Sequence, residues 1–218
     1  MKITWLGHSA FRLEESTGTT VVTDPYSESL VGYRMRKVAA DAVTVSHGHK
    51  DHCELSRIEG GAEVLDTVGF WEVKGVDITS MLSYHDAAKG AHRGQNLIFK
   101  YRMDGVDLCH LGDIGEECGV STGDAIGTVN VLMIPVGGNY TIDAARAKEY
   151  VDFLMPDIVI PMHYRTPSCN IDIERVNDFL DLFDEEQLVY VDGDTIEVDR
   201  EYFDGDRTKV IVFSDKNF

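Results

Sequence analysis

Long hydrophobic runs are missing from this sequence. No apolar stretch approaches the roughly 18 residues that a transmembrane helix needs. The N-terminal segment also reaches the polar pair Gly7-His8 too early to build the hydrophobic core of a signal peptide. These absences argue against a helical membrane protein, and we expect a protein that acts in the cytoplasm.

Cysteine is scarce, which argues against a disulfide scaffold. The four cysteines, Cys53, Cys109, Cys118 and Cys169, show no Cys-x-x-Cys spacing and are too few to cross-link 218 residues. We therefore expect reduced thiols. Cys53 and Cys109 each adjoin a histidine and could contact a metal, although a small buried hydrophobic role is commoner for a lone cysteine.

Positive charge is also in short supply. The chain has 20 Lys and Arg against 38 Asp and Glu, which gives a formal net charge of −18. Proteins bind nucleic acids and anionic membranes through Lys and Arg, so we expect neither partner here. The sequence also lacks the Gly-x-Ser-x-Gly, P-loop and Gly-x-Gly-x-x-Gly motifs of serine hydrolases, nucleotide triphosphatases and dinucleotide-binding enzymes.

The composition that remains is that of an ordinary globular protein, 43% hydrophobic and 27% charged. Nothing in the length demands two domains, so we expect one domain over residues 1–218. Short apolar runs predict strands, and apolar residues at helical spacing predict fewer helices between them, which favours a layered α/β fold. The predicted strands are 2–6, 10–14, 19–23, 43–46, 63–65, 76–82, 97–101, 106–110, 129–134 and 158–162, and the predicted helices are 51–58, 143–153 and 173–183.

Three histidines and an aspartate are packed into six positions directly after the apolar run 42–45. They are His47, His49, Asp51 and His52. Imidazole nitrogen suits zinc and its first-row neighbours, and a carboxylate beside three histidines offers more donors than one tetrahedral ion needs, which favours two ions. The alternatives are a histidine-rich surface loop, or a helix whose N-cap is Asp51 and whose capping box is completed by Glu54.

Further candidate ligands follow other predicted strands, where loops carry chemistry. They are His85, Asp113 and His163, with His92 as a rival of His85. Taken singly, Asp113 could make an Asx turn and each histidine could be a core or surface residue. Together with the first cluster, however, these residues place three more donors after three more strands. A metal-binding cavity shared by several loops requires such an arrangement.

The motif His47-x-His-x-Asp-His52 resembles the signature of the metallo-β-lactamase superfamily. The segments 7–9, 23–25, 110–113, 134–138 and 160–166 are similar to a small hydrolase-like branch related to L-ascorbate-6-phosphate lactonases. The resemblance implies a four-layer αββα sandwich with two divalent ions, zinc most of all and manganese as an alternative. It implies that one ion is bound by His47, His49 and His85, that the other is bound by Asp51, His52 and His163, and that Asp113 bridges them.

The same resemblance implies positioning or substrate-adjacent roles for His8, Asp24 and His110. Arg93, Asn96, Tyr140, Tyr164 and Arg165 lie near the proposed ligands in sequence, and each could contact substrate or could serve in packing. The expected oligomeric state is open, with a homo-oligomer possible.

Two ions about 3.5 to 4 Å apart can share a water and hold a nucleophilic hydroxide at neutral pH. We therefore expect hydrolysis of a small ester or lactone, with Asp51 as a ligand that also aims the nucleophile. With two divalent ions, the pocket keeps a charge of about +1, so a small anionic substrate is admissible. The alternatives are a phosphodiesterase or nuclease, and a catalytically silent metal-binding protein. A di-iron redox site is disfavoured because His49 stands where those sites carry Glu.

Overall fold

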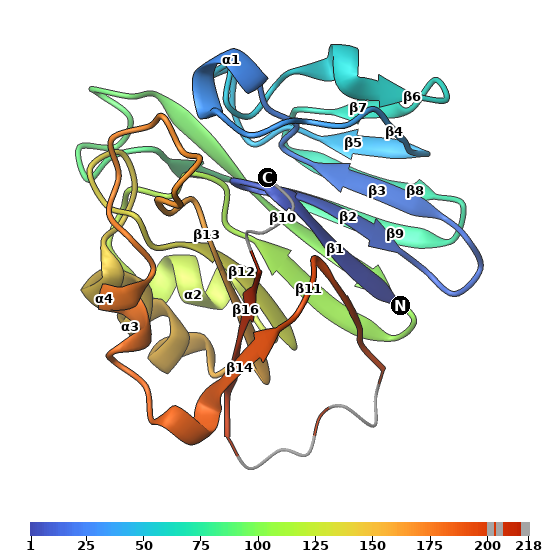
Figure 1. Cartoon of the computed structure of the whole chain (residues 1–218). Coiled ribbons are helices and arrows are strands. Elements are labelled where there is room, and N and C mark those ends of the chain that lie inside the picture. The colour runs from blue at the N-terminus through green and yellow to red at the C-terminus, as the bar shows by residue number, and fades with distance from the viewer. Residues whose placement is uncertain (200–202, 204–206, 215–218) are drawn as a thin grey trace.

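The computed structural model describes residues 1–199, 203 and 207–214, and its architecture is two packed sheets with helices outside them (Figure 1). In the described part of the chain, the first sheet has the strand order β15-β1-β2-β3-β5-β7. Its strands are β1 (Lys2–Gly7), β2 (Ala10–Glu14), β3 (Thr20–Thr23), β5 (Ala42–Thr44), β7 (Glu63–Leu65) and β15 (Thr195–Glu197).

The second sheet has the strand order β14-β16-β13-β12-β11-β10-β9-β8. Strands β8 to β11 pair antiparallel, whereas β11, β12, β13, β16 and β14 pair parallel. Its strands are β8 (Gly69–Val73), β9 (Val76–Tyr84), β10 (Gln95–Met103), β11 (Val106–His110), β12 (Val131–Pro135), β13 (Ile158–Met162), β14 (Leu188–Val191) and β16 (Lys209–Phe213). Short strands β4 (Val38–Ala39) and β6 (Ile58–Glu59) form a separate pair.

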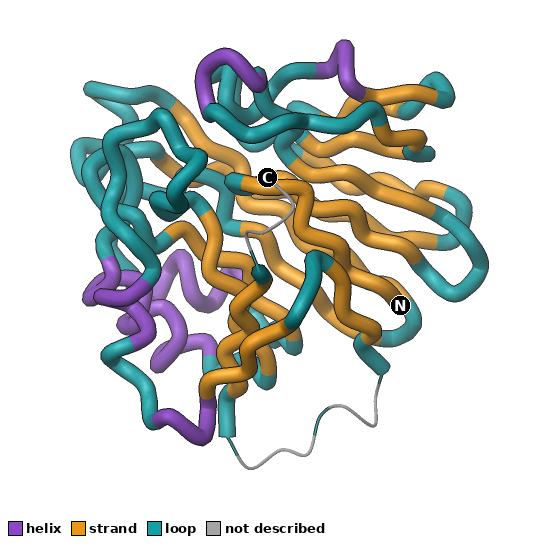
Figure 2. Tube along the Cα trace, in the orientation of Figure 1, coloured by secondary structure: helices purple, strands orange, loops and turns teal. Residues whose placement is uncertain are grey.

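Helices lie on opposite outer sides of the strands, as Figure 2 shows. Helices α2 (Val120–Ile126), α3 (Ala144–Leu154) and α4 (Asn177–Leu180) lie together beside the second sheet, and α1 (Glu28–Val31) lies near the first sheet (Figure 1). The mixed α/β class and the layered sandwich are therefore confirmed. No helix in the described residues is long and apolar enough to cross a bilayer.

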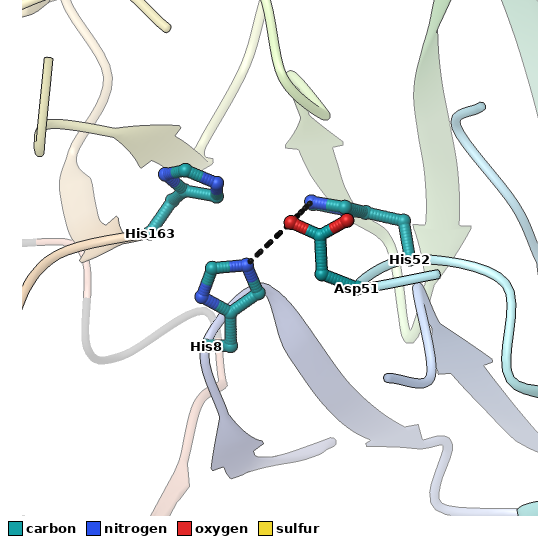
Figure 3. Close-up of side chains that lie close together, drawn as sticks. All are labelled: His8, Asp51, His52 and His163. Carbon is teal, nitrogen blue, oxygen red and sulfur yellow. Dashed lines mark ion pairs between the residues drawn. The ribbon is translucent and has the colours of Figure 1, made fainter. Parts of the chain in front are cut away.

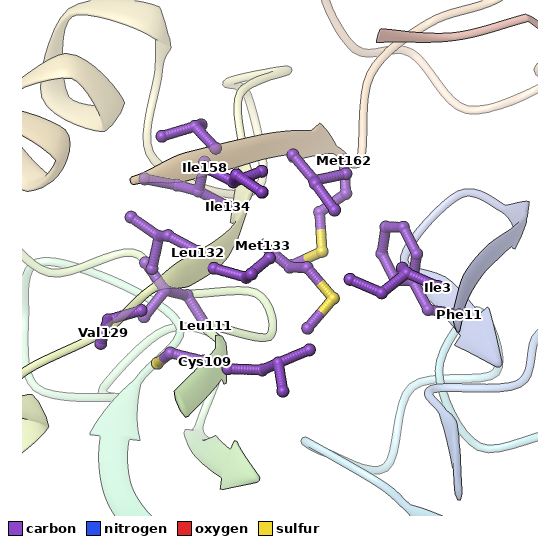
Figure 4. Packing of buried hydrophobic residues seen from close by; sticks show 14 of the residues in the cluster. Ile3, Phe11, Cys109, Leu111, Val129, Leu132, Met133, Ile134, Ile158 and Met162 are labelled. Carbon is purple, nitrogen blue, oxygen red and sulfur yellow. The ribbon is translucent and has the colours of Figure 1, made fainter. Parts of the chain in front are cut away.

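The main core fills the space between the two sheets. All five residues of β12 and of β13 are buried, as expected for parallel strands covered on both faces. In Figure 4, Met133 and Met162 from these strands point toward Ile3 and Phe11 of the first sheet. Burial of each such side chain contributes about 1.5 to 3 kcal/mol, so the docking of the two sheets stabilises the fold substantially.

Helix α3 matches its predicted bounds within one residue, because its N-cap residue and its apolar spacing both indicate the same helix. The Asp143 side chain accepts a hydrogen bond from the backbone N–H of Arg146 at 2.9 Å, which satisfies one of the free donors of the first turn. Ala147, Tyr150 and Val151 recur at helical spacing and are buried against the sheet.

The helix predicted at 51–58 does not form. The chain makes only a 3₁₀ turn at Leu55–Arg57, whose N-cap is Glu54 and not Asp51. Asp51 is turned instead toward His8 and His52, with carboxylate-to-imidazole distances of 3.6 and 3.7 Å. The capping-box alternative for Asp51 is therefore wrong, because its side chain takes part in a cluster of imidazoles.

The helix predicted at 173–183 is reduced to one turn, α4. Backbone hydrogen bonds to other loops hold the first residues of the predicted helix. Glu174 N–H donates to the Gly137 carbonyl at 2.7 Å, and Arg165 N–H donates to the Glu174 carbonyl at 2.8 Å. These tertiary hydrogen bonds replace the helical ones that the apolar spacing predicted for this segment. Helices α1 and α2 and strands β4, β6, β8, β14, β15 and β16 were not predicted. Helix α2 contains Ser, Thr and Gly, which are poor helix formers.

Candidate metal centre

The candidate ligands come from loops that directly follow strands of both sheets. Residues 47–52 follow β5, His85 follows β9, Asp113 lies shortly after β11, and His163 follows β13. His8 follows β1 in the same way. Because these strands end at one common edge of the sandwich, their loops meet there, as the sequence predicted for the four segments.

Three site residues that stand immediately after strands have left-handed backbone conformations. The φ angles are 53° at His8, 38° at Asp24 and 52° at His163. Such angles are uncommon for residues other than glycine and concentrate at functional sites. The turn at His8 is held by its own carbonyl oxygen, which accepts hydrogen bonds from Trp5 Nε1 at 3.1 Å and from His163 N–H at 3.4 Å.

Donor atoms of these loops cluster into three overlapping groups, each with its atoms within 4.8 Å of one another. Each group could hold a metal ion. The groups are His47, His49 and His85; His47, His52 and Asp113; and His8, Asp51, His52 and His163. All seven residues proposed as ligands from the sequence are brought together, and His8 joins them.

The carboxylate of Asp113 lies in the middle of the groups. Its Oδ2 is 3.3 Å from Nε2 of His85 and 3.3 Å from Nε2 of His163, and its Oδ1 is 3.2 Å from Nε2 of His52. These histidines belong to different groups. Asp113 therefore connects the donors on one side of the centre to those on the other.

Several of these buried atoms have no hydrogen-bond partner, which is the strongest sign that the residues fit a metal. They are both ring nitrogens of His8 and of His163, Nε2 of His47 and of His52, Nδ1 of His85 and Oδ1 of Asp113. A buried polar atom left without a partner costs about 1 to 3 kcal/mol of stability. The large number of such atoms in one place therefore needs a common explanation. Divalent cations would satisfy nitrogen and carboxylate oxygen atoms together.

Asp24 fixes the orientation of His52. Its Oδ2 lies 2.8 Å from Nδ1 of His52, while its two oxygens also accept hydrogen bonds from the hydroxyl and backbone N–H of Ser46. The other ring nitrogen of His52 therefore faces Asp113. Burial works to raise the pKa of Asp24, but the hydrogen bond from His52 keeps the pKa below its ordinary value.

Asn96 fixes the backbone of Asp113. The Asn96 side chain is fully buried, donates to Ser83 Oγ and to the Leu111 carbonyl, and accepts a hydrogen bond from Asp113 N–H at 2.9 Å. Gly112 makes this approach possible, since its φ is 58° and a β-carbon there would lie 2.3 Å from the Asn96 Oδ1 atom. Asn96 thus supports Asp113 and does not line the pocket.

Three imidazoles of the centre, His8, His47 and His52, have pKa values far from the ordinary one. Burial and neighbouring imidazoles lower the pKa of His8 to about 4 and of His47 to about 3. Burial also works to lower the pKa of His52, but the adjacent charge of Asp113 and the hydrogen bond to Asp24 raise it well above 6.5. His8 and His47 are therefore neutral at pH 7, which is the form that binds a metal.

His8 stands among the donors and not behind them (Figure 3). Its ring is fully buried, its Nε2 lies 3.6 Å from Asp51 Oδ2, and its centroid lies 4.3 Å from that of His163. The sequence signal for this position is the pair Gly7-His8 at the end of a strand, but the approach to His163 depends on the packing of the two sheets.

Other histidines and cysteines lie outside the groups. His92 is exposed, and among the described residues its backbone N–H alone is bonded, to Asp86. His110 is buried with both ring nitrogens bonded to backbone, to the Ser9 carbonyl and Gly112 N–H, so it anchors the loop that carries Asp113. Cys53 and Cys109 are in none of the groups.

A pocket of about 570 Å³ opens beside the centre. His49, Asp51, His85 and Asp113 line one part of it. The rest of the wall consists of Leu30, Arg93, Tyr140, Asn170, Ile171 and Asp172. Of the residues considered as substrate contacts from sequence, Arg93 and Tyr140 are here, whereas Tyr164 stacks on Trp5 and Arg165 lines a different hollow.

Comparison with known proteins agrees with this geometry. Residues 2–163 match the model of the beta-lactamase superfamily domain. The chain is similar to UPF0173 metal-dependent hydrolases from Thermoplasma acidophilum, at 30% identity over 76% of this chain and 84% of the relative, and from Archaeoglobus fulgidus, at 30% over 76% and 84%.

Among solved structures, the chain is similar to a Thermotoga maritima protein of the metallo-β-lactamase superfamily whose name proposes a zinc-dependent hydrolase. The two share 36% sequence identity with a TM-score of 0.79, over 98% of this chain and 99% of that one. The match covers both sheets and the loops at their common edge. The chain belongs to the metallo-β-lactamase superfamily.

Proposed function

We propose that this protein is a metal-dependent hydrolase with a dinuclear centre that acts on a small ester, lactone or related substrate. The observation that carries the proposal is the position of Asp113, within 3.3 Å of histidines from two different donor groups. A carboxylate so placed suits two cations better than one. The names of the relatives, which are metal-dependent hydrolases, support the reaction class.

The donor groups suggest how the residues divide. His47, His49 and His85 would hold the first ion, and Asp51, His52 and His163 the second, with Asp113 between them. We add His8 to the second set, because both of its ring nitrogens are buried without a partner. Nitrogen-rich donors with carboxylates favour zinc, with manganese as the alternative. The name of the Thermotoga relative also points to zinc.

Bound divalent ions would supply a hydroxide nucleophile at neutral pH and a Lewis acid for the substrate oxygen. The protein residues supply position and polarity. Asp51, which is half-buried at the pocket wall, would accept a hydrogen bond from the nucleophile and fix its direction. Asp24 holds His52 in one tautomer, and Asn96 holds Asp113 in place.

The pocket and the charge of the chain favour a small substrate. A volume of about 570 Å³ is in the range of small-molecule sites. The net charge of −18 opposes binding of nucleic acids, which makes a nuclease the weaker alternative. We also propose that residues 1–218 form one domain, since one hydrophobic cluster includes residues of both sheets.

The test combines metal content with turnover. The metal-free protein is loaded with zinc, its bound metal is measured by elemental analysis, and it is assayed against neutral esters, lactones, thioesters and bis(4-nitrophenyl) phosphate. We expect two ions per chain and hydrolysis of carbonyl substrates. Asp51→Ala should abolish hydrolysis, whereas Asp152→Ala, at a side chain that is 63% exposed on α3, should not.

Each other outcome identifies an alternative. Zero or one weakly held ion under metal-replete conditions would reject the dinuclear centre. Two ions with turnover of the phosphodiester alone would indicate a phosphodiesterase. Two ions with no turnover of any substrate would indicate a metal-binding protein without catalysis.

A further inference from the structure

Arg93 is a basic residue without an acidic partner in a strongly acidic chain. Acidic residues outnumber basic ones by 38 to 20, yet no ion pair or side-chain hydrogen bond of Arg93 is present in the described residues. Its Nη1 atom is buried and has no hydrogen-bond partner. A guanidinium normally pairs with an oxyanion through two parallel N–H bonds, so this one retains an unused capacity for such a group.

The side chain is fixed in place by an aromatic ring. The guanidinium carbon of Arg93 lies 4.7 Å from the centre of the Tyr140 ring. Stacking of this kind stabilises the cation but leaves the N–H groups at its rim free to bind. Tyr140 comes from the loop after β12, so the two residues approach from different segments.

The backbone of Arg93 is also held. The carboxylate of Asp86 accepts four backbone N–H bonds, from Ala88, Gly90, His92 and Arg93, at 2.8 to 3.0 Å. Asp86 therefore organises the loop that follows His85, and its oxygens are occupied by the backbone. The loop presents Arg93 as part of the pocket wall, with His49 and His85 in the same wall.

We propose that Arg93, braced by Tyr140, binds an anionic group of the substrate, a carboxylate or a phosphate, beside the metal centre. The proposal rests on the hydrolase function proposed above and narrows its substrate class. The other charged groups of the pocket wall are Asp51 and Asp113, which belong to the proposed metal ligands, and Asp172, an exposed residue that makes no ion pair with Arg93. The anionic group would lie away from the bond that is cleaved.

The kinetic test uses two esters that differ in charge, 4-nitrophenyl acetate and mono-4-nitrophenyl succinate, with zinc-loaded protein. Arg93→Gln should raise the KM of the succinate ester about 10- to 100-fold, the range for a charged hydrogen-bond pair, and should leave the acetate ester within about twofold. Arg93→Lys should recover part of the loss. Arg102→Gln, which removes the same charge from a 58% exposed side chain paired with Asp107, is the matched control.

The binding test needs no turnover and separates the two anions. Inorganic phosphate and acetate are titrated calorimetrically into zinc-loaded wild type, Arg93→Gln and Arg102→Gln. We expect Arg93→Gln to weaken at least one of them about 10-fold or more, and the anion that is weakened identifies the group. Unchanged binding of both anions, or an equal loss for the neutral and anionic esters, would overturn the proposal.

The two arms distinguish this proposal from the hydrolase function. If the wild type hydrolyses no ester but loses anion affinity in Arg93→Gln, the anion site stands and the hydrolase function fails. If esters are cleaved without preference for charge and Arg93→Gln changes nothing, the hydrolase function stands and the anion site fails.

Discussion

Nδ1 of His52 lies 2.8 Å from Oδ2 of Asp24, and this contact sets which nitrogen of His52 faces the candidate metal centre. Both residues are buried, and Asp24 is held in turn by Ser46. A carboxylate in this position fixes the ring orientation and strengthens the other nitrogen as a ligand.

Asp24→Asn should weaken the second ion. The amide has the size of the carboxylate but lacks its charge, so the tautomer and basicity of His52 are no longer fixed. We expect about 10- to 100-fold lower affinity for one of two zinc ions, measured by competition with a chelator. Asp143→Asn serves as the control because Asn also caps helix α3 well. Equal affinities in Asp24→Asn and wild type would contradict the role of Asp24.

His85→Ala and His92→Ala form a matched pair. His85 is 2% exposed and its Nε2 lies 3.3 Å from Asp113, whereas His92 is exposed and belongs to no donor group. His85→Ala should therefore reduce bound zinc from two ions to one and abolish hydrolysis. His92→Ala should keep both. The reverse pattern in elemental analysis would assign the ligand to His92.

His8→Asn should selectively weaken the second ion. Asparagine tolerates the left-handed conformation that the backbone adopts at this position, so the fold should survive the change. We expect the first ion to stay bound and the affinity for the second to fall about 10-fold or more, the loss typical of a metal-site partner. Cobalt-substituted protein gives a separate readout, because loss of a nitrogen ligand changes its visible absorption. Unchanged spectra and affinity would place His8 outside the coordination sphere.

Acid should destabilise the metal-free protein. Burial lowers the pKa values of His8 and His47 to about 4 and about 3, and lowers those of His85 and His110 as well. Between these values and the unfolded value near 6.5, the unfolded chain binds more protons than the folded one, so stability falls as the pH falls. The raised pKa of His52 acts in the opposite direction only above about pH 6.5, because below that pH its imidazole is protonated in both the folded and the unfolded chain.

Because the four lowered pKa values act below pH 6.5, where His52 is protonated in both states, the free energy of unfolding of the metal-free protein should decrease from pH 6.5 to pH 5. Denaturant titrations in the presence of a chelator measure it directly. A stability that stays flat or rises over this interval would contradict the lowered pKa values of these four imidazoles.

The parts of the fold that were predicted from sequence are those where local pattern and tertiary environment agree. Strands β12 and β13 are continuous apolar runs, and α3 has both an Asp cap and a helical apolar face. The predictions of local structure fail where contacts with residues distant in sequence determine the conformation. Asp51 is drawn to imidazoles instead of capping a helix, and residues before α4 bond to the loop at Gly137.

The candidate site divides in the same way. The candidate ligands between His47 and His52 could be identified from the sequence because they are nearly contiguous. His85, Asp113 and His163 could be identified because they follow recognisable strands. The donor position of His8 could not be derived, because it depends on the approach of β1 to the loop after β13. The contact of Arg93 with Tyr140 likewise joins two loops whose separation no local pattern specifies.

The contact between His8 and His163 joins residues that are far apart in the sequence. The donors His47, His49 and His85 lie in the first half of the chain, whereas His163 comes after β13, and β1 pairs with β15 near residue 196. Contacts of such long range form slowly, since much of the chain must be ordered before they close. During synthesis the second half of the centre therefore assembles only after most of the polypeptide has emerged.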